Sequence, residues 1–267
     1  MDLEVRGKGY LVVGGTAGIG LAAARVLAAD GAAVAIAGRD GERARAAAAA
    51  IAADLGPQPV VVTGDITEPG AAEHLVSEAA AGLGGLAGVA ITAGANPLAH
   101  SPVGTATDEA WLETFDAMLL GTVRVVRAAL PHLVERGGGT IVTTAAYSIH
   151  AYHPVRAPYV AMKTAVASFT KMVAKAYGPS GVRANCVCPG AIETGALAAL
   201  RRQVAAETGD PVEQALERHL WDLFHMEVAL GRPGKPEEVG ELFALLLSPR
   251  AGYLNGAVVN IDGGTDF

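Results

Sequence analysis

The chain has 267 residues, of which 51% are hydrophobic, so it can bury the core of one large α/β domain. A net charge of −7, with no cluster of Lys and Arg, argues against a nucleic-acid-binding surface. Two cysteines, Cys186 and Cys188, are too few for a disulfide framework and are expected to be small buried side chains, not a metal site.

The N-terminal segment, MDLEVRGKGYLVVGG (1–15), does not have the pattern of a signal peptide. It is acidic from its second residue and contains only a short apolar run. No apolar stretch of the chain is expected to be long enough to span a bilayer. The sequence therefore predicts a cytoplasmic protein without a membrane partner.

Seven short apolar runs, each ending in Gly or polar residues, are predicted to be buried strands. They lie at 10–15, 33–38, 59–65, 88–94, 139–145, 182–190 and 258–264. Helical patterns lie between them at 18–30, 40–55, 70–82, 108–136, 158–177 and 235–248. This alternation predicts an α/β fold, namely a Rossmann-type doubly wound parallel sheet of about seven strands with helices on both faces. No linker divides the chain, so 1–267 is expected to form a single dinucleotide-binding and catalytic domain.

A glycine-rich turn, VGGTAGIG (13–20), follows the first predicted strand and opens the first predicted helix. Gly14, Gly18 and Gly20 would let the backbone turn tightly and leave room for a diphosphate at the positive end of the helix. In a chain so rich in glycine, a plain tight connection is the alternative. The position of the turn within a βαβ unit favours a dinucleotide site.

The end of the second predicted strand bears on the choice of cofactor. An acidic residue there would bind the ribose hydroxyls of NAD and repel a 2′-phosphate, but Gly38 occupies that position and Arg39 follows. A guanidinium binds phosphate well, and Arg43 lies one helical turn later. A solvated Arg39 is the alternative, and Asp40 beside it opposes phosphate binding. NADP(H) is favoured over NAD(H).

With Gly14-x-x-x-Gly18-x-Gly20 and Tyr159-x-x-x-Lys163, the chain resembles the short-chain dehydrogenase/reductase family. The resemblance covers essentially the whole chain and includes, in order, GDIT (64–67), ITAG (91–94), VRANCVCPG (182–190), GRPGKPEEV (231–239) and NIDGG (260–264). It implies hydride transfer between a nicotinamide cofactor and a small-molecule alcohol or carbonyl substrate, in a homotetramer or homodimer. The cofactor-binding residues that it implies are Gly14, Thr16, Ala17, Gly18, Ile19, Gly20, Arg39, Asp65, Ile66, Ala93, Gly94, Tyr159, Lys163, Pro189, Gly190, Ile192 and Thr194.

The resemblance also makes Tyr159 and Lys163 the proton-transfer pair. A phenol with a pKa of about 10 is a poor base at neutral pH. A nearby ammonium group and the positive nicotinamide ring would stabilise the phenolate and lower that pKa. Residues four apart on a helix share one face, which suits this pairing.

Two positions depart from the family's usual set of Asn, Ser, Tyr and Lys. Alignment without gaps puts Met118, whose thioether cannot donate a hydrogen bond, at the Asn position and Ala146 at the Ser position. Ser148 points to the same side as Ala146 if the chain stays extended, and it is the third predicted catalytic residue. Two residues of strand cover about 6.6 Å, so the loop must curl back for a direct replacement. Other candidates to hold the substrate oxygen are His150, Tyr152 and His153.

The segment 191–230 has no strand pattern, but its apolar residues have helical spacing. The resemblance implies that it covers the substrate, with Trp221, Phe224 and Met226 as apolar contacts; a surface helix packed on the core or on another subunit is the alternative.

Three functions stay open at this point. The first is an NADP(H)-dependent oxidoreductase acting on a ketone or secondary alcohol. The second is a lyase, isomerase or epimerase on the same scaffold, because a fold does not determine chemistry. The third is a cofactor-binding sensor or structural subunit without turnover, for which the substitutions at Met118 and Ala146 argue.

Overall fold

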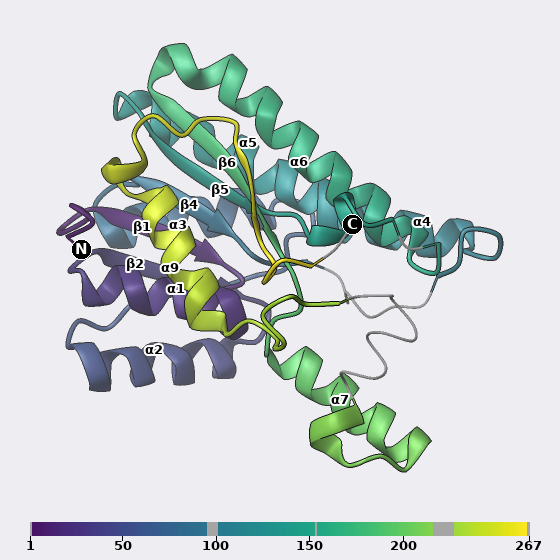
Figure 1. Ribbon diagram of the computed structural model, residues 1–267. Coiled ribbons are helices and arrows are strands. Elements are labelled where there is room, and N and C mark those ends of the chain that lie inside the picture. The colour runs from purple at the N-terminus through teal and green to yellow at the C-terminus, as the bar shows by residue number, and fades with distance from the viewer. Residues whose placement is uncertain (1, 95–100, 153, 216–226, 266–267) are drawn as a thin grey trace.

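The computed structural model describes residues 2–94, 101–152, 154–215 and 227–265. Its centre is a seven-stranded parallel sheet in the order β3-β2-β1-β4-β5-β6-β7 (Figure 1). The strands are β1 (Gly9–Val13), β2 (Ala33–Gly38), β3 (Val60–Thr63), β4 (Gly88–Ile91), β5 (Gly139–Thr144), β6 (Val182–Pro189) and β7 (Val258–Ile261). The predicted Rossmann-type doubly wound sheet is confirmed.

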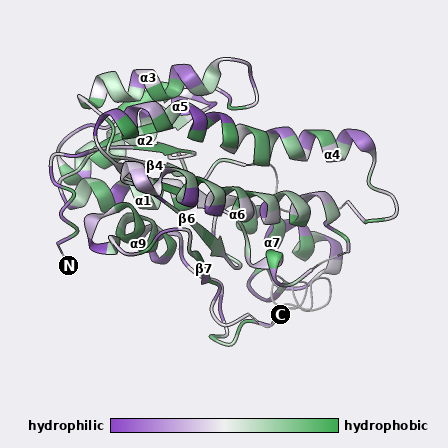
Figure 2. Cartoon of the chain, turned by 90° about the horizontal axis from the view of Figure 1, so that it is seen from above, coloured by the Kyte–Doolittle hydropathy of each residue, from purple (hydrophilic) through white to green (hydrophobic). Residues whose placement is uncertain are grey.

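Helices cover both faces of this sheet. Apolar side chains of α1 (Gly18–Ala29), α2 (Gly41–Leu55) and α9 (Pro236–Leu247) form one buried cluster with the strands. Those of α3 (Ala71–Leu83), α5 (Gly121–Glu135) and α6 (Ala157–Tyr177) form a second cluster. Figure 2 shows hydrophilic and hydrophobic residues side by side along α3 and α5, as expected for helices with one face on the sheet and one on solvent.

The strand register determines where a ligand can bind. Val13, the last residue of β1, is opposite Ala37 of β2 on one side and Ile91 of β4 on the other. The chain leaves β1 for β2 and β3 and returns to β4 on the other side of β1, so the strand order reverses at β1. In a doubly wound sheet, the crevice at such a reversal binds the ligand at the carboxyl ends of the strands.

The predicted helix at 108–136 is present, but its hydrogen-bonding pattern changes from α-helical to π-helical and back along its length. It consists of α4 (Asp108–Thr114), a π-helical segment η1 (Phe115–Leu120) and α5. Met118 lies in the π-helical segment, and its carbonyl accepts a hydrogen bond from the Thr122 hydroxyl at 2.7 Å. π-Helical segments are rare in proteins as a whole, and those that occur are often at functional sites. A hydrophobic period of 3.6 residues in the sequence does not reveal them.

By length and composition alone, the run Asp108–Glu135 is long and apolar enough to cross a membrane. This differs from the expectation that no stretch would be. The apolar residues of α5 are buried against the sheet and α3, among them Val125, Ala129 and Leu133. The α5 part of the run therefore packs in the core of this fold through its apolar face, whereas α4 has no buried residue.

After β6 the chain forms α7 (Gly195–Thr208), which Figure 1 shows apart from the sheet. Residues 195–208 of the segment 191–230 form this helix, and the substrate-covering role of the segment stays a prediction. Trp221, Phe224 and Met226 lie outside the described residues. Short 3₁₀ helices complete the fold at Tyr147–Ile149 (η2), Gly178–Ser180 (η3) and Pro249–Ala251 (η4).

Candidate functional site

A cavity of about 800 Å³ opens at the carboxyl edge of the sheet, beside the strand-order reversal. Its walls come from the segments that directly follow β1, β2, β3 and β4, from the start of α6, and from the chain around Thr194. A cavity of this size suits a small molecule or a cofactor. Segments that are far apart in the sequence meet here because parallel strands all end at the same edge.

The glycine-rich turn forms one wall through close backbone contacts. At Gly14, where φ is +87°, an added Cβ would lie 2.6 Å from the backbone nitrogen of Ala93. An added Cβ at Gly20 would lie 2.3 Å from the carbonyl oxygen of Gly14. The N-cap of α1 is Ala17, which has no side-chain acceptor for the first-turn N–H groups. Those groups and the positive end of the helix dipole fit an anionic group such as a diphosphate.

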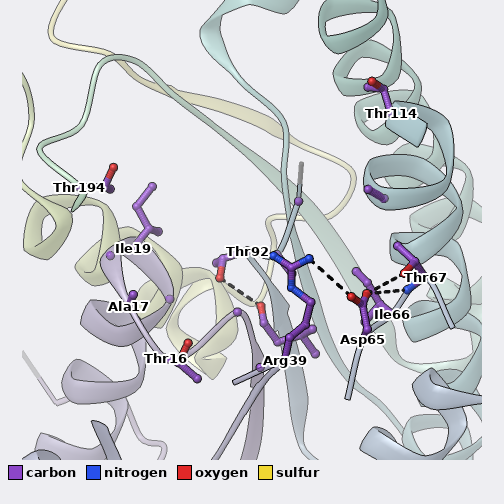
Figure 3. A pocket seen from close by; sticks show the side chains of 18 of the residues that line it. Thr16, Ala17, Ile19, Arg39, Asp65, Ile66, Thr67, Thr92, Thr114 and Thr194 are labelled. Carbon is purple, nitrogen blue, oxygen red and sulfur yellow. Dashed lines mark hydrogen bonds and ion pairs between the residues drawn. The ribbon is translucent and has the colours of Figure 1, made fainter. Parts of the chain in front are cut away.

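A second wall lies at the end of β2. An added Cβ at Gly38 would lie 2.7 Å from the Cγ2 atom of Thr16, so an acidic side chain at this position would displace Thr16. Arg39 follows, with 73% of its side chain exposed, and its Nη1 lies 3.5 Å from Oδ2 of Asp65 (Figure 3). Asp65 also accepts hydrogen bonds from the N–H and the hydroxyl of Thr67, at 3.0 and 2.8 Å.

Two arginines and one aspartate bring charge to this wall. Partial burial raises the pKa of Asp65, but the bonds from Thr67 and the charge of Arg39 outweigh it and lower that pKa overall. Asp40, which opposed phosphate binding in the sequence, instead caps α2 by accepting bonds from the N–H groups of Glu42 and Arg43, both at 3.0 Å. Within the described chain, Arg39 and Arg43 line the cavity and Asp40 does not.

The start of α6 forms the opposite wall, with Tyr159 lining the cavity. Lys163 lies one turn further along the helix and is buried. Its Nζ donates to the carbonyl oxygen of Thr144 at 2.8 Å and lies 5.9 Å from the centroid of the Tyr159 ring. Burial lowers the pKa of Lys163 to about 8. Tyr159 and Lys163 therefore share one face of α6, as their spacing predicts.

Arg156 is a cavity-lining residue that the sequence analysis did not identify. Its side chain is buried, with a 6% exposed residue surface, and its guanidinium carbon lies 4.2 Å from the centroid of the Tyr159 ring. Burial raises the pKa of Tyr159, and the charge and a hydrogen bond of Arg156 act against that rise. No local sequence pattern indicated this contact, because Arg156 precedes the predicted helix and is the N-cap of α6.

The segment after β5 does not stay extended, so the alternation that would place Ser148 on the same side as Ala146 does not apply. The N–H of Ile149 donates to the carbonyl of Ala146 at 3.1 Å, and η2 turns the chain into the protein. Ser148 is 0% exposed and is not part of the described lining of the cavity. Its Oγ has no hydrogen-bond partner among the described residues. The arrangement does not support the assignment of Ser148 as a catalytic donor, which stays a prediction without structural support.

Replacing Ser148 by Ala is therefore expected to leave turnover unchanged and to leave stability unchanged or slightly higher. A buried hydroxyl without a partner costs desolvation free energy, and removing it recovers part of that cost. The checks are kcat with any accepted substrate and the urea midpoint of unfolding, measured beside the parent. A large fall in kcat with unchanged stability would show that Ser148 does reach the substrate.

Other predicted residues fall into two groups. The cavity lining contains Gly14, Thr16, Ala17, Gly18, Ile19, Gly20, Arg39, Asp65, Ile66, Ala93, Gly94, Tyr159 and Thr194. The described lining does not include Lys163, Pro189, Gly190 or Ile192. Gly190 donates its N–H to the carbonyl of Ile261 at 3.0 Å, and Ile192 bridges to Gly234. Cys186 and Cys188 are buried in β6, as expected. The lining residues that the sequence did not indicate include Thr67, Thr92, Ser101, Glu113, Thr114 and Ala117.

Three loop residues had been candidates to hold the substrate oxygen. His150 and Tyr152 are exposed and are not in the described lining. His153 lies outside the described residues. Asn185, from the motif VRANCVCPG, joins β6 to the C-terminal segment. Its side-chain amide donates to the carbonyl of Leu254 and accepts from the N–H of Ala257.

The chain is similar to known proteins over nearly its whole length. A family model described as "Enoyl-(Acyl carrier protein) reductase" matches residues 14–266. Dehydrogenase/reductase SDR family member 4 of Mus musculus is 31% identical over 261 residues, covering 97% of this chain and 87% of that protein. Inactive 2-(S)-hydroxypropyl-CoM dehydrogenase 2 of Xanthobacter autotrophicus is 33% identical over 241 residues, covering 90% and 98%.

Among solved structures, the L-sorbose reductase of Gluconobacter frateurii in complex with NADPH and L-sorbose superposes with a TM-score of 0.92. The two sequences are 26% identical, and the match covers 99% of this chain and 98% of the reductase. The chain belongs to the short-chain dehydrogenase/reductase family, an oxidoreductase family that binds a nicotinamide cofactor.

Proposed function

We propose that the protein is an NADP(H)-dependent oxidoreductase that interconverts a small-molecule ketone and the corresponding secondary alcohol. The observation that carries the proposal is the meeting of three features at one cavity: the glycine-rich turn, the Arg39 wall and Tyr159. The first fits a diphosphate, the second a 2′-phosphate, and the third a proton-transfer step. The NADPH complex of the similar sorbose reductase supports the choice of cofactor.

The residues of the chain would divide the work as follows. The backbone of the turn around Gly18 holds the diphosphate, and Arg39 and Arg43 hold the 2′-phosphate. The cofactor, when bound, supplies or accepts the hydride. The hydroxyl of Tyr159 gives its proton to the carbonyl oxygen during reduction, and its phenolate takes that proton back during oxidation. The ammonium group of Lys163, which donates to the Thr144 carbonyl, would act as a hydrogen-bond donor near Tyr159.

The cofactor preference gives a direct prediction. The parent protein is expected to bind NADPH more tightly than NADH, and Arg39→Ala is expected to weaken NADPH binding by roughly tenfold to a hundredfold, the size of a lost charge-assisted hydrogen bond. NADH binding should change little, because NADH has no 2′-phosphate. Fluorescence titration of both cofactors measures the effect. Arg45→Ala, an exposed arginine of α2, the helix that follows Arg39, is the matched control. Tighter binding of NADH by the parent would contradict the proposal.

A cofactor-binding protein without turnover is the second candidate. Met118 and Ala146 occupy the positions where the family usually has Asn and Ser, and one similar protein is described as inactive. The two candidates agree on NADPH binding and differ in turnover.

The expected cytoplasmic location and homodimeric or homotetrameric assembly belong to the proposal as well. Gel filtration with light scattering tests the assembly.

A further inference from the structure

Arg156 is a buried cation fixed beside the proton-transfer tyrosine. It occupies the N-cap position of α6, where its carbonyl accepts the N–H of Val160 at 3.0 Å. Its backbone pairs with Ser101 in a parallel bridge, and the N–H of Ala157 donates to the Ser101 carbonyl at 3.1 Å. These contacts hold the backbone of Arg156 in place at the cavity. The guanidinium therefore has a defined position over the Tyr159 ring, not a range of positions in solvent.

Arg156 is closer to the phenol ring than Lys163 is. The guanidinium carbon lies 4.2 Å from the ring centroid, whereas the Lys163 ammonium lies 5.9 Å away and already donates to Thr144. Burial lowers the pKa of Lys163 to about 8, and the Arg156 charge adds to that lowering. A guanidinium stays protonated at every pH at which the protein is folded. Of these two cations, Arg156 is thus the one that lies closer to the Tyr159 ring and carries a permanent charge.

A cation over an aromatic face is attracted by the negative charge of the π system, and the attraction grows when water is excluded. A phenolate ring carries a full negative charge, so the same cation stabilises the phenolate more than it stabilises the phenol. Burial alone acts in the opposite direction, because it disfavours the charged form. Arg156 at Tyr159 therefore offsets the cost of placing the proton-transfer group in a partly buried wall.

We propose that Arg156 is a positioning residue that orients the Tyr159 ring and stabilises its phenolate, so that the positive charge at the proton-transfer site comes from a Tyr–Arg pair as well as from Lys163. This inference rests on the proposed function. During alcohol oxidation, the substrate hydroxyl gives its proton to the phenolate oxygen as the carbinol carbon loses a hydride to the cofactor. During reduction, the phenol returns that proton to the carbonyl oxygen as the carbon gains the hydride.

Few other titratable groups of the described chain face the phenol. Besides Arg156, these are Lys163 on α6, Tyr147 on η2 and Cys188 on β6, and Glu113 on α4 lines the same cavity. Burial raises the pKa of Tyr147 to about 12, so that group stays neutral. A hydrogen bond with the neighbouring cysteine, together with burial, raises the pKa of Cys188, so its thiol stays neutral too. Loss of the guanidinium therefore acts on the phenol directly and, in the opposite direction, through a higher pKa of Lys163.

The first test is the pH profile of Arg156→Gln in the direction of alcohol oxidation. The rate rises with pH as the phenolate forms, and removing the cation raises the pKa of the phenol, so the rising limb should move to higher pH. At neutral pH kcat should fall on the order of tenfold, the size expected for one desolvated cation–π contact, while the KM for NADP⁺ stays nearly unchanged. Arg156→Lys should return the limb toward that of the parent. A profile of Arg156→Gln that superimposes on the parent's would overturn the proposal.

The second test does not need turnover. Ultraviolet difference titration of the parent and of Tyr159→Phe isolates the ionisation of Tyr159, and the same pair of measurements in the Arg156→Gln background gives its shift. The midpoint should be higher without Arg156 and unchanged in the control Arg45→Gln; an equal midpoint would overturn the Tyr–Arg pair. A higher midpoint without any turnover would support the pair and contradict the oxidoreductase proposal. If circular dichroism shows that Arg156→Gln is unfolded, Arg156→Met, which keeps the apolar stem, takes its place.

Discussion

Tyr159→Phe is expected to lower kcat by roughly 10²- to 10⁴-fold, the usual contribution of a general acid or base, while NADPH binding stays nearly unchanged. The substitution removes only the hydroxyl that exchanges the proton with the substrate oxygen. The ring stays, so it still packs under the Arg156 guanidinium, 4.2 Å away in the parent. Because Ala146 has no hydroxyl and Ser148 is buried, neither of these side chains can supply a substitute proton to the substrate.

The measurements are steady-state kinetics with an accepted ketone and fluorescence titration with NADPH. Tyr253→Phe, a fully exposed tyrosine, is the control and should behave like the parent. Full activity in Tyr159→Phe would show that another group transfers the proton. Loss of NADPH binding along with activity would instead indicate that the substitution disturbs the whole cavity.

Gly20→Ala is expected to lower the free energy of unfolding by about 1–3 kcal/mol and to weaken NADPH binding strongly. The new Cβ would lie 2.3 Å from the Gly14 carbonyl oxygen and 2.4 Å from Oγ1 of Thr92. Alanine ordinarily favours a helix over glycine by about 1 kcal/mol, but here the close neighbour is backbone of the turn itself and cannot swing aside. Relief of the clash must therefore move the turn that lines the cavity.

Urea unfolding and NADPH titration of the same variant separate the two effects. Gly104→Ala is the matched control, since an added Cβ at Gly104 meets nothing within 4 Å and its φ is not positive. A Gly20→Ala variant that is as stable as the parent and binds NADPH equally well would show that the turn adapts and that this close contact is not needed for binding.

The arrangement of the sheet could be predicted from the sequence because its strands are buried on both faces. All five residues of β1 are buried, so the run YLVV has no polar alternation and stands out from the helical patterns around it. The position of the glycine-rich turn directly after β1 then indicated that the cofactor binds at the carboxyl edge of the sheet. The pairing of Val13 with both Ala37 and Ile91 was not accessible in this way, because it depends on the family topology and not on any local pattern.

The active-site wall was harder to predict, for two physical reasons. No local pattern predicted that the chain after Thr144 leaves the strand conformation. The two-residue alternation of a strand therefore placed Ser148 on the same side as Ala146, whereas η2 turns the chain and Ser148 is buried. Arg156 precedes a predicted helix and looks like an ordinary solvated residue until the tertiary structure buries it against Tyr159. Both residues lie in segments between a strand and a helix, whose conformation is determined by long-range packing and not by local propensity.

Transfer of deuterium from NADPH to a ketone tests the central claim most directly. The protein is incubated with NADPH deuterated at the transferable position of the nicotinamide ring and with a panel of aliphatic, cyclic and aromatic ketones, and the alcohol products are analysed by mass spectrometry. The expected result is one deuterium at the carbinol carbon of at least one product with the parent protein, and a strongly reduced yield with Tyr159→Phe. Tight NADPH binding without labelled alcohol from any ketone of the panel would contradict the claim and favour the cofactor-binding protein without turnover.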